Sequence, residues 1–200
     1  QTKQISGTAA IPKTYEYGVE NGELYSKEIA SATEWVKTRT DFLGRSYEKI
    51  YPDSFTETTL YDSLGRVEAT ENSDGLKLID VYNGVSGKLQ YRVLKRTPGD
   101  TIDWNADQVT EFDDGYRLRD SVTVVRYQET FLRFSGVETL VSASETSRDG
   151  KQSWTVQNGQ TTHTARVFGP SDGETVETTT NFDGSTLVNT YQDGILTLSE

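Results

Sequence analysis

Residues 41–45 have the sequence DFLGR and residues 62–66 have the sequence DSLGR, so four of five positions agree at a separation of 21 residues. The agreeing residues are Asp41, Leu43, Gly44 and Arg45 in the first copy and Asp62, Leu64, Gly65 and Arg66 in the second. Tyr61 precedes the second copy, and Tyr82 follows 21 residues later, where the aromatic, polar, Gly, basic order returns with one residue inserted. A fixed period of this length is typical of repeat proteins, in which each unit packs against its neighbours.

A second signal has the same period. An Asp followed by Gly or Ser lies eight residues before an aromatic residue in three places, namely Asp53 before Tyr61, Asp74 before Tyr82 and Asp183 before Tyr191. The complete frame places the first residue of each unit near Tyr17, Thr40, Tyr61, Tyr82, Trp104, Tyr127, Thr146, Phe168 and Tyr191. This frame predicts about nine units of 21 residues.

Apolar and polar residues alternate between the turn signals, for example in residues 76–81 and 89–93, and this alternation is typical of β-strands. Thr and other β-branched residues are abundant, and residues 25–37, which are compatible with a short helix, also fit the strand frame. Pairs that favour type I′ hairpin turns recur along the chain, namely Asn21-Gly22, Asp74-Gly75, Asn83-Gly84, Asp149-Gly150, Asn158-Gly159, Asp172-Gly173, Asp183-Gly184 and Asp193-Gly194.

These patterns predict an all-β fold, an antiparallel meander of repeated β-hairpins that forms a twisted or spiralling ribbon. We expect one β-repeat domain over residues 1–200, with the best-matched repeats in 40–90 and divergent repeats in 104–200. Only 33% of the residues are hydrophobic and the mean hydropathy is −0.65, so a thin fold with modest burial is expected.

Charge and composition exclude several functions. A net charge of −11 would repel phosphate backbones, so nucleic acid is not an expected partner. No apolar run is long enough to span a membrane, and the lack of Cys excludes disulfides, thiolate nucleophiles and Cys-ligated zinc. The chain begins with Gln1 and not Met, which favours a processed, secreted or surface-exposed protein.

The segment Tyr61-Asp62-Ser63-Leu64-Gly65-Arg66, with Asp53 before it and Tyr82 after it, resembles the tyrosine-aspartate (YD) repeats of RHS proteins. That family includes shells of bacterial toxin complexes, wall-associated proteins and teneurins. The resemblance implies a ribbon of β-hairpins that spirals into a shell, with the Tyr side chains stacked along it. It also implies a secreted or cell-surface structural protein, whose partners are neighbouring repeats or copies of the same chain.

Catalytic chemistry has little support in the sequence. His163 is the only histidine, and no Gly-x-Ser-x-Gly elbow accompanies it. Strand alternation favours a surface or packing role for this side chain. Paired carboxylates are not informative because 31 acidic residues produce such pairs by chance. We therefore expect no catalytic site and no organic cofactor.

Calcium is the most specific ligand that the residues suggest. Asp103, Asn105, Asp107, Glu111 and Asp114 place oxygen ligands at positions 1, 3, 5, 9 and 12 of a segment similar to EF-hand loops. Gln108 replaces the Gly that such a loop needs at its turn, and no helices are expected beside it. An acidic hairpin loop without metal is therefore the alternative.

Three functional classes remain open. The first is a scaffold or shell segment of a repeat protein. The second is a self-assembling fibre subunit, because unpaired strand edges, including the final segment 193–200, can pair with another copy. The third is a carbohydrate-binding adhesive module, in which exposed rings such as Trp35, Trp104 and Trp154 would stack on sugars.

Overall fold

The computed structural model describes residues 3–7 and 10–200, and every regular element in them is a β-strand. The 17 strands are β1 (Lys3–Gly7), β2 (Ala10–Glu20), β3 (Glu23–Ser31), β4 (Glu34–Thr40), β5 (Ser46–Ile50), β6 (Thr56–Tyr61), β7 (Val67–Asn72), β8 (Lys77–Tyr82), β9 (Leu89–Leu94), β10 (Gln108–Arg119), β11 (Thr123–Phe134), β12 (Val137–Ser147), β13 (Gln152–Gln157), β14 (Gln160–Phe168), β15 (Glu174–Thr180), β16 (Thr186–Gln192) and β17 (Ile195–Ser199). The predicted all-β class is confirmed, and residues 25–37 lie in β3 and β4.

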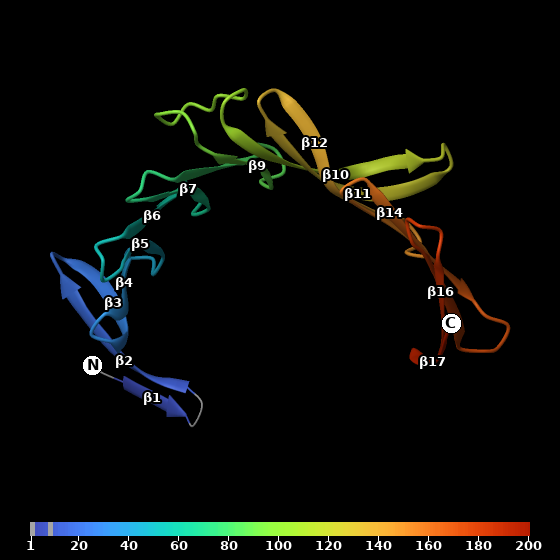
Figure 1. Ribbon diagram of the computed structural model, residues 1–200, viewed down its shortest axis with the longest axis horizontal. Coiled ribbons are helices and arrows are strands. Elements are labelled where there is room, and N and C mark those ends of the chain that lie inside the picture. The colour runs from blue at the N-terminus through green and yellow to red at the C-terminus, as the bar shows by residue number, and fades with distance from the viewer. Residues whose placement is uncertain (1–2, 8–9) are drawn as a thin grey trace. The chain divides into compact units, whose positions relative to one another are not determined.

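Within β1 to β8 and within β10 to β17, each strand pairs with the next strand of the chain in antiparallel register (Figure 1), so the predicted meander is also confirmed. The chain divides into two compact units. The first contains residues of Gln1–Val81 and Arg92–Ile102, and the second contains Tyr82–Tyr91 and Asp103–Glu200. Strand β9 contributes residues to both.

One turn recurs through the first unit and explains the sequence period. Asp41, Tyr51, Asp62 and Asn72 each open a turn in which their amide donates to the carbonyl four residues later, at 2.9–3.0 Å. Their own carbonyl accepts from the amide three residues later, at 2.9–3.1 Å. The openings are alternately 10 and 11 residues apart, so two strands and two turns together occupy 21 residues.

Asp or Asn opens three of these four turns because the side chain holds the backbone in the turned conformation. Oδ1 of Asp62 accepts from the amides of Leu64 and Arg66, both at 2.9 Å. Oδ1 of Asp41 does the same one repeat earlier. This local bonding is the reason that Asx residues favour turns.

The turn types differ in part from the prediction. Positive φ at both central residues, as type I′ requires, occurs at three of the eight predicted pairs, namely Asn21-Gly22, Asn158-Gly159 and Asp193-Gly194. In four other pairs the Gly alone has positive φ. In the Asn83 turn the left-handed residue is Gly87, with φ +70°, and not Gly84, because one extra residue lengthens the turn.

The 21-residue frame does not continue through the second unit. Strands β10, β11 and β12 contain 12, 12 and 11 residues, and the predicted unit start Tyr127 lies inside β11 and not at its end. The structure therefore gives no support for nine equal units. Longer hairpins here replace the short strands of residues 46–82.

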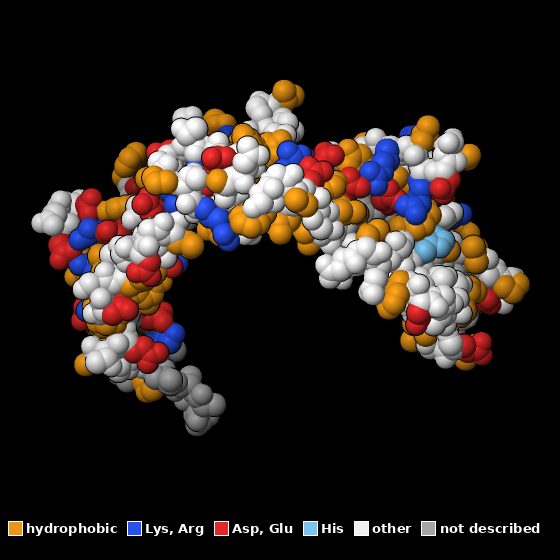
Figure 2. Space-filling model, turned by 45° about the horizontal axis from the view of Figure 1, so that its top comes forward, with side chains coloured by type: hydrophobic (Ala, Val, Ile, Leu, Met, Phe, Trp, Pro, Cys, Tyr) orange, Lys and Arg blue, Asp and Glu red, His pale blue; other side chains and the backbone are white. Residues whose placement is uncertain are grey.

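Few side chains are buried, as the composition predicted. The buried apolar residues are Ala69, Val93, Val109, Val125, Ala143 and Trp154, and the buried polar residues are Asp80, Lys95, Asp107, Glu145 and Ser147. On β10 to β13 these residues lie on one face of the sheet, and the other face is mostly exposed. Figure 2 shows charged side chains of both signs among apolar ones in each unit. In the described part of the chain, no helix is long and apolar enough to cross a membrane.

The turn geometry predicts effects of different size for two glycine substitutions. Gly65 has φ +80°, and a Cβ there would also lie 3.2 Å from Nη1 of Arg45, so Gly65→Ala should lower the free energy of unfolding by about 1–2 kcal/mol. Gly84→Ala should change it by less than about 0.5 kcal/mol, because Gly84 has no positive φ and no atom within 4 Å of an added Cβ. Urea unfolding curves of both variants measure these changes, and equal losses would contradict the assigned turn types.

Candidate functional site

The predicted repeat residues Asp41, Arg45 and Tyr61 meet in one cluster. Nε of Arg45 donates to Oδ2 of Asp41 at 2.7 Å, and its guanidinium carbon lies 4.6 Å from the centre of the Tyr61 ring. The Tyr61 hydroxyl donates to the carbonyl of Ser46 at 2.6 Å. Arg45 thus connects its own turn to the tyrosine of the next repeat, as cation–π packing allows. Its carboxylate partner, Asp41, lies in the same turn.

Asp62 and Arg66 repeat the ion pair one period later, with Nε of Arg66 2.7 Å from Oδ2 of Asp62. Partial burial raises the pKa of the Asp62 carboxyl, but hydrogen bonds from the backbone and side chain of Arg66 and from the amide of Leu64 outweigh it. The pKa of Asp62 is therefore lowered, and the pKa of Asp41 is lowered for the same reasons with Arg45 and Leu43.

The lowered pKa values predict acid sensitivity. A carboxyl whose pKa is lower in the folded state stabilises the fold above its ordinary pKa of 3.8, and this contribution is lost as the pH falls through the lowered value. The double variant Asp41→Asn, Asp62→Asn should lose less stability than the wild type between pH 7 and pH 3. Asn is suitable because Asn72 forms the same turn through its side-chain oxygen.

Thermal melting at several pH values measures this effect. Asp74→Asn is the control, since it removes the negative charge of a turn residue to whose carboxylate no described residue donates a hydrogen bond. Melting temperatures of the double variant that fall in parallel with those of the wild type would contradict the prediction.

The remaining repeat residues lie in turns or near strand ends. Oδ1 of Asp53 accepts from the amide of Phe55 at 3.1 Å, and Oδ1 of Asp183 accepts from the amide of Ser185 at 2.9 Å. The amide of Asp74 donates to Asn72. Tyr82 ends β8, and Tyr191 lies in β16 opposite Thr175 and Leu196.

The five predicted calcium ligands do not form one cluster. Asp103, Asn105 and Asp107 share the loop before β10, where the fully buried Asp107 accepts a hydrogen bond from the amide of Asp103 at 2.9 Å. Glu111 and Asp114 lie on opposite faces of β10, because they are three residues apart on a strand. Arg133 binds Glu111 and Lys88 binds Asp114. Among the described residues, no group of three or more His, Cys, Asp or Glu side chains is arranged to hold a metal.

His163 packs on a neighbouring strand. It lies opposite Trp154 in the register of β13 and β14, and the two rings stack at 4.8 Å between centres with 9° between planes. Its Nε2 is buried without a hydrogen-bond partner. On the other side of the Trp154 ring, the guanidinium carbon of Arg119 lies 4.3 Å from the ring centre. The imidazole, indole and guanidinium together form a stacked group across the sheet.

Glu145 holds two arginines beside this group. It is 5% exposed, it accepts from Nε of Arg117 at 2.7 Å, and it also binds Arg119. Arg117 in addition lies over the ring of Tyr127, 4.6 Å from its centre, and pairs with Glu129 at 2.6 Å. These contacts place charged and aromatic side chains at positions that aliphatic side chains occupy in a thicker protein.

Removal of the Glu145 carboxylate should lower the free energy of unfolding. Glu145→Ala leaves two guanidiniums without their buried partner, so we expect a loss of about 2 kcal/mol, below the full cost of breaking a buried pair because both arginines are partly exposed. Glu138→Ala removes the exposed partner of Arg133 and should cost about 0.5 kcal/mol or less. Urea unfolding curves of the two variants give both values. Equal costs would contradict the structural role of Glu145.

Sequence reasoning missed a glycine–tyrosine contact that occurs in both units. Gly18 lies opposite Tyr25, and a Cβ on the glycine would lie 2.9 Å from the ring. Gly115 lies opposite Tyr127 in the same way, at 3.1 Å. The tyrosine ring therefore covers the cross-strand glycine in each case. The sequence signal that could have revealed this contact is a Gly inside a strand pattern, because such a Gly indicates close approach of another group.

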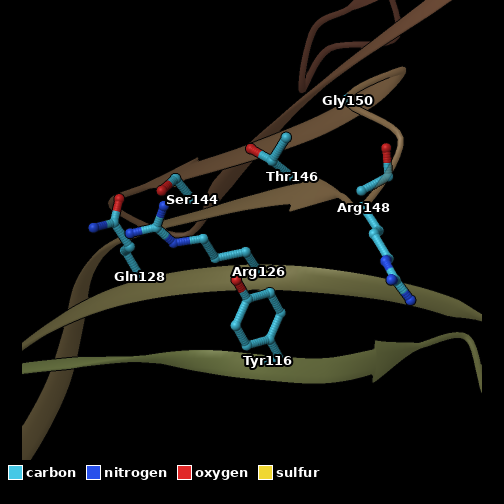
Figure 3. A pocket seen from close by; sticks show the side chains of 8 residues that line it. Tyr116, Arg126, Gln128, Ser144, Thr146, Arg148 and Gly150 are labelled. Carbon is cyan, nitrogen blue, oxygen red and sulfur yellow. The ribbon is translucent and has the colours of Figure 1, made fainter.

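A polar hollow lies on the exposed face of β10, β11 and β12, with a volume of about 400 Å³ (Figure 3). Tyr116, Arg126 and Thr146 stand side by side in register across these three strands. Gln128 and Ser144 form the neighbouring row, and Ser147, Arg148 and Gly150 complete the lining. In Figure 3 the side chains of Arg126 and Arg148 extend in different directions on either side of Tyr116.

Tyr116 presents a ring that is 74% exposed. Each tryptophan that the sequence suggested for sugar stacking contacts a neighbouring side chain, although Trp104 is still 44% exposed. Trp35 lies under Lys27, Trp104 contacts Tyr91, and Trp154 is buried. The hollow offers an exposed ring, two cationic side chains and neutral polar groups.

Comparison with known proteins adds no assignment. A scan against protein-family models matches no family, and a search of the curated proteins finds no significant match.

Proposed function

We propose that this chain is a non-catalytic structural and interaction module, a scaffold or shell segment of the RHS (YD-repeat) type from a secreted or surface-exposed protein. The observation that carries this proposal is the recurring turn at Asp41, Tyr51, Asp62 and Asn72. It has the 21-residue spacing and the Asp–Arg–Tyr contacts that give each motif residue a structural task.

The cross-strand contacts of the second unit support the same role. Arg117, Arg119, Glu145 and Trp154 bind one another on one face, so these charged groups join strands. A sheet held in this way can be extended by further hairpins without a separate core, which suits a scaffold built from repeats.

A fibre subunit is the second candidate, and β17 favours it. Its residues are all exposed, and they include Ile195 at 71%, Leu196 at 52% and Leu198 at 51%. An apolar strand of this kind can pair with a strand of another copy. A carbohydrate-binding module is the third candidate, supported by the polar hollow beside Tyr116.

Light scattering across a concentration series tests the scaffold proposal against the fibre. We expect a mass of 22.4 kDa at every concentration from about 1 µM to about 500 µM, because the scaffold role requires no association of separate copies of this segment. A mass that rises with concentration would overturn the proposal in favour of the fibre. The rise should then be lost in Ile195→Lys, Leu198→Lys and kept in Leu118→Lys, which adds a charge at an exposed apolar position of β10.

A further inference from the structure

Two arginines stand apart from the other cations of the chain. Among the side chains that the structure describes, those of Arg126 and Arg148 have no carboxylate, hydrogen-bond or aromatic partner, whereas the other Lys and Arg residues have one. The chain contains 31 acidic residues against 20 basic ones, so carboxylates are in excess. Both arginines line the same hollow, and their guanidiniums extend to different sides of Tyr116 (Figure 3).

The surroundings of these arginines leave them available to a ligand. The carboxylate of Asp114, on the same face of β10, is taken by Lys88, and Glu145 points to the opposite face, where it binds Arg117 and Arg119. A guanidinium presents a planar set of donors that fits a carboxylate through two parallel hydrogen bonds. The hollow is therefore suited to an anionic group.

The neutral groups indicate that the anion is carried by a sugar. The exposed ring of Tyr116 provides a flat surface on which a pyranose ring can stack. Gln128, Ser144 and Thr146 provide donors and acceptors for sugar hydroxyls. A small inorganic anion would use the arginines and would leave the ring and the amide without a role.

A track of hydroxyls continues from the hollow across the same face. Thr146, Ser153, Thr164 and Thr179 lie opposite one another in successive strands from β12 to β15, and Oγ1 of Thr164 is 3.2 Å from Oγ1 of Thr179. Neighbouring strands are about 4.8 Å apart, so the row supplies hydroxyls at regular intervals. An extended chain of sugars can follow such a row.

We propose that the hollow binds a carboxylate-bearing sugar of an acidic polysaccharide, whose chain continues over the hydroxyls of β12 to β15. This inference rests on the carbohydrate-binding candidate and is independent of the scaffold role. The net charge of −11 disfavours a dense polyanion, because only the two free arginines oppose the repulsion of the whole chain. A polymer with spaced carboxylates, such as a polyuronate, fits better than a nucleic acid.

Isothermal titration with the full chain tests the proposal. The probes are short oligogalacturonates and the same oligosaccharides with their carboxyl groups methyl-esterified. We expect the acid form to bind and the ester to bind at least about tenfold more weakly, because each lost charge-assisted hydrogen bond is worth about this factor. Arg126→Ala and Arg148→Ala should each weaken binding of the acid form by about tenfold, and Tyr116→Ala should weaken both forms.

Arg166→Ala is the matched control, since it removes the same charge from the same face but from an arginine already paired with Glu177. It should leave the affinity within about twofold, and melting temperatures show that each variant is folded. No binding of the acid form, or equal binding of acid and ester, would overturn the proposal. Binding of acetate or dextran sulfate as tight as that of the oligogalacturonate would also overturn it, because a general anion site would then explain the result. None of these failures affects the light-scattering test of the scaffold.

Discussion

Contacts between side chains on neighbouring strands stabilise this chain where a thicker protein would use an apolar core. With few residues buried, the sheet depends on groups such as Arg119, Trp154 and His163, stacked from strand to strand, and on Glu145 between two arginines. Such contacts combine apolar packing with charge pairing at the same positions. The low apolar content and the high share of charged residues are therefore consistent with a stable fold.

The same constraint explains why the two faces of β10 to β15 differ. One face carries the charged and aromatic groups that bind one another across β10 to β14. The other carries the row of Ser and Thr hydroxyls, the ion pairs of Asp114 and Arg166, and, among the described side chains, the two unpaired arginines Arg126 and Arg148. Because side chains alternate on a strand, the position of a residue in that alternation determines on which of the two faces it lies. The contacts of Glu145, Arg117, Arg119 and Trp154 lie on the first face, so Arg126 and Arg148 on the second face are available to bind a ligand.

The sequence predicted well what is local. The turns at Asp41 and Asp62 are determined by an Asx side chain, a Gly and their spacing, so the period and the hairpins could be found without a structure. The proposed calcium ligands were chosen by spacing along the chain, but on a strand Glu111 and Asp114 point to opposite faces. The hollow brings together residues from β10, β11 and β12 that share no motif, and only the register of the long hairpins shows that they are neighbours. The equal-unit frame was not found in this region because the strands there are about twice as long as those of residues 46–82.

The pairing of each strand with the next strand of the chain has a consequence for how such a protein can change in length. Insertion or removal of one whole hairpin keeps the direction of every later strand and keeps each side chain on its face, whereas a change by a single strand would reverse the direction of all that follow. A lineage built in this way can therefore gain or lose length in steps of two strands, and residues on the two faces can diverge at different rates without disturbing the pairing between strands.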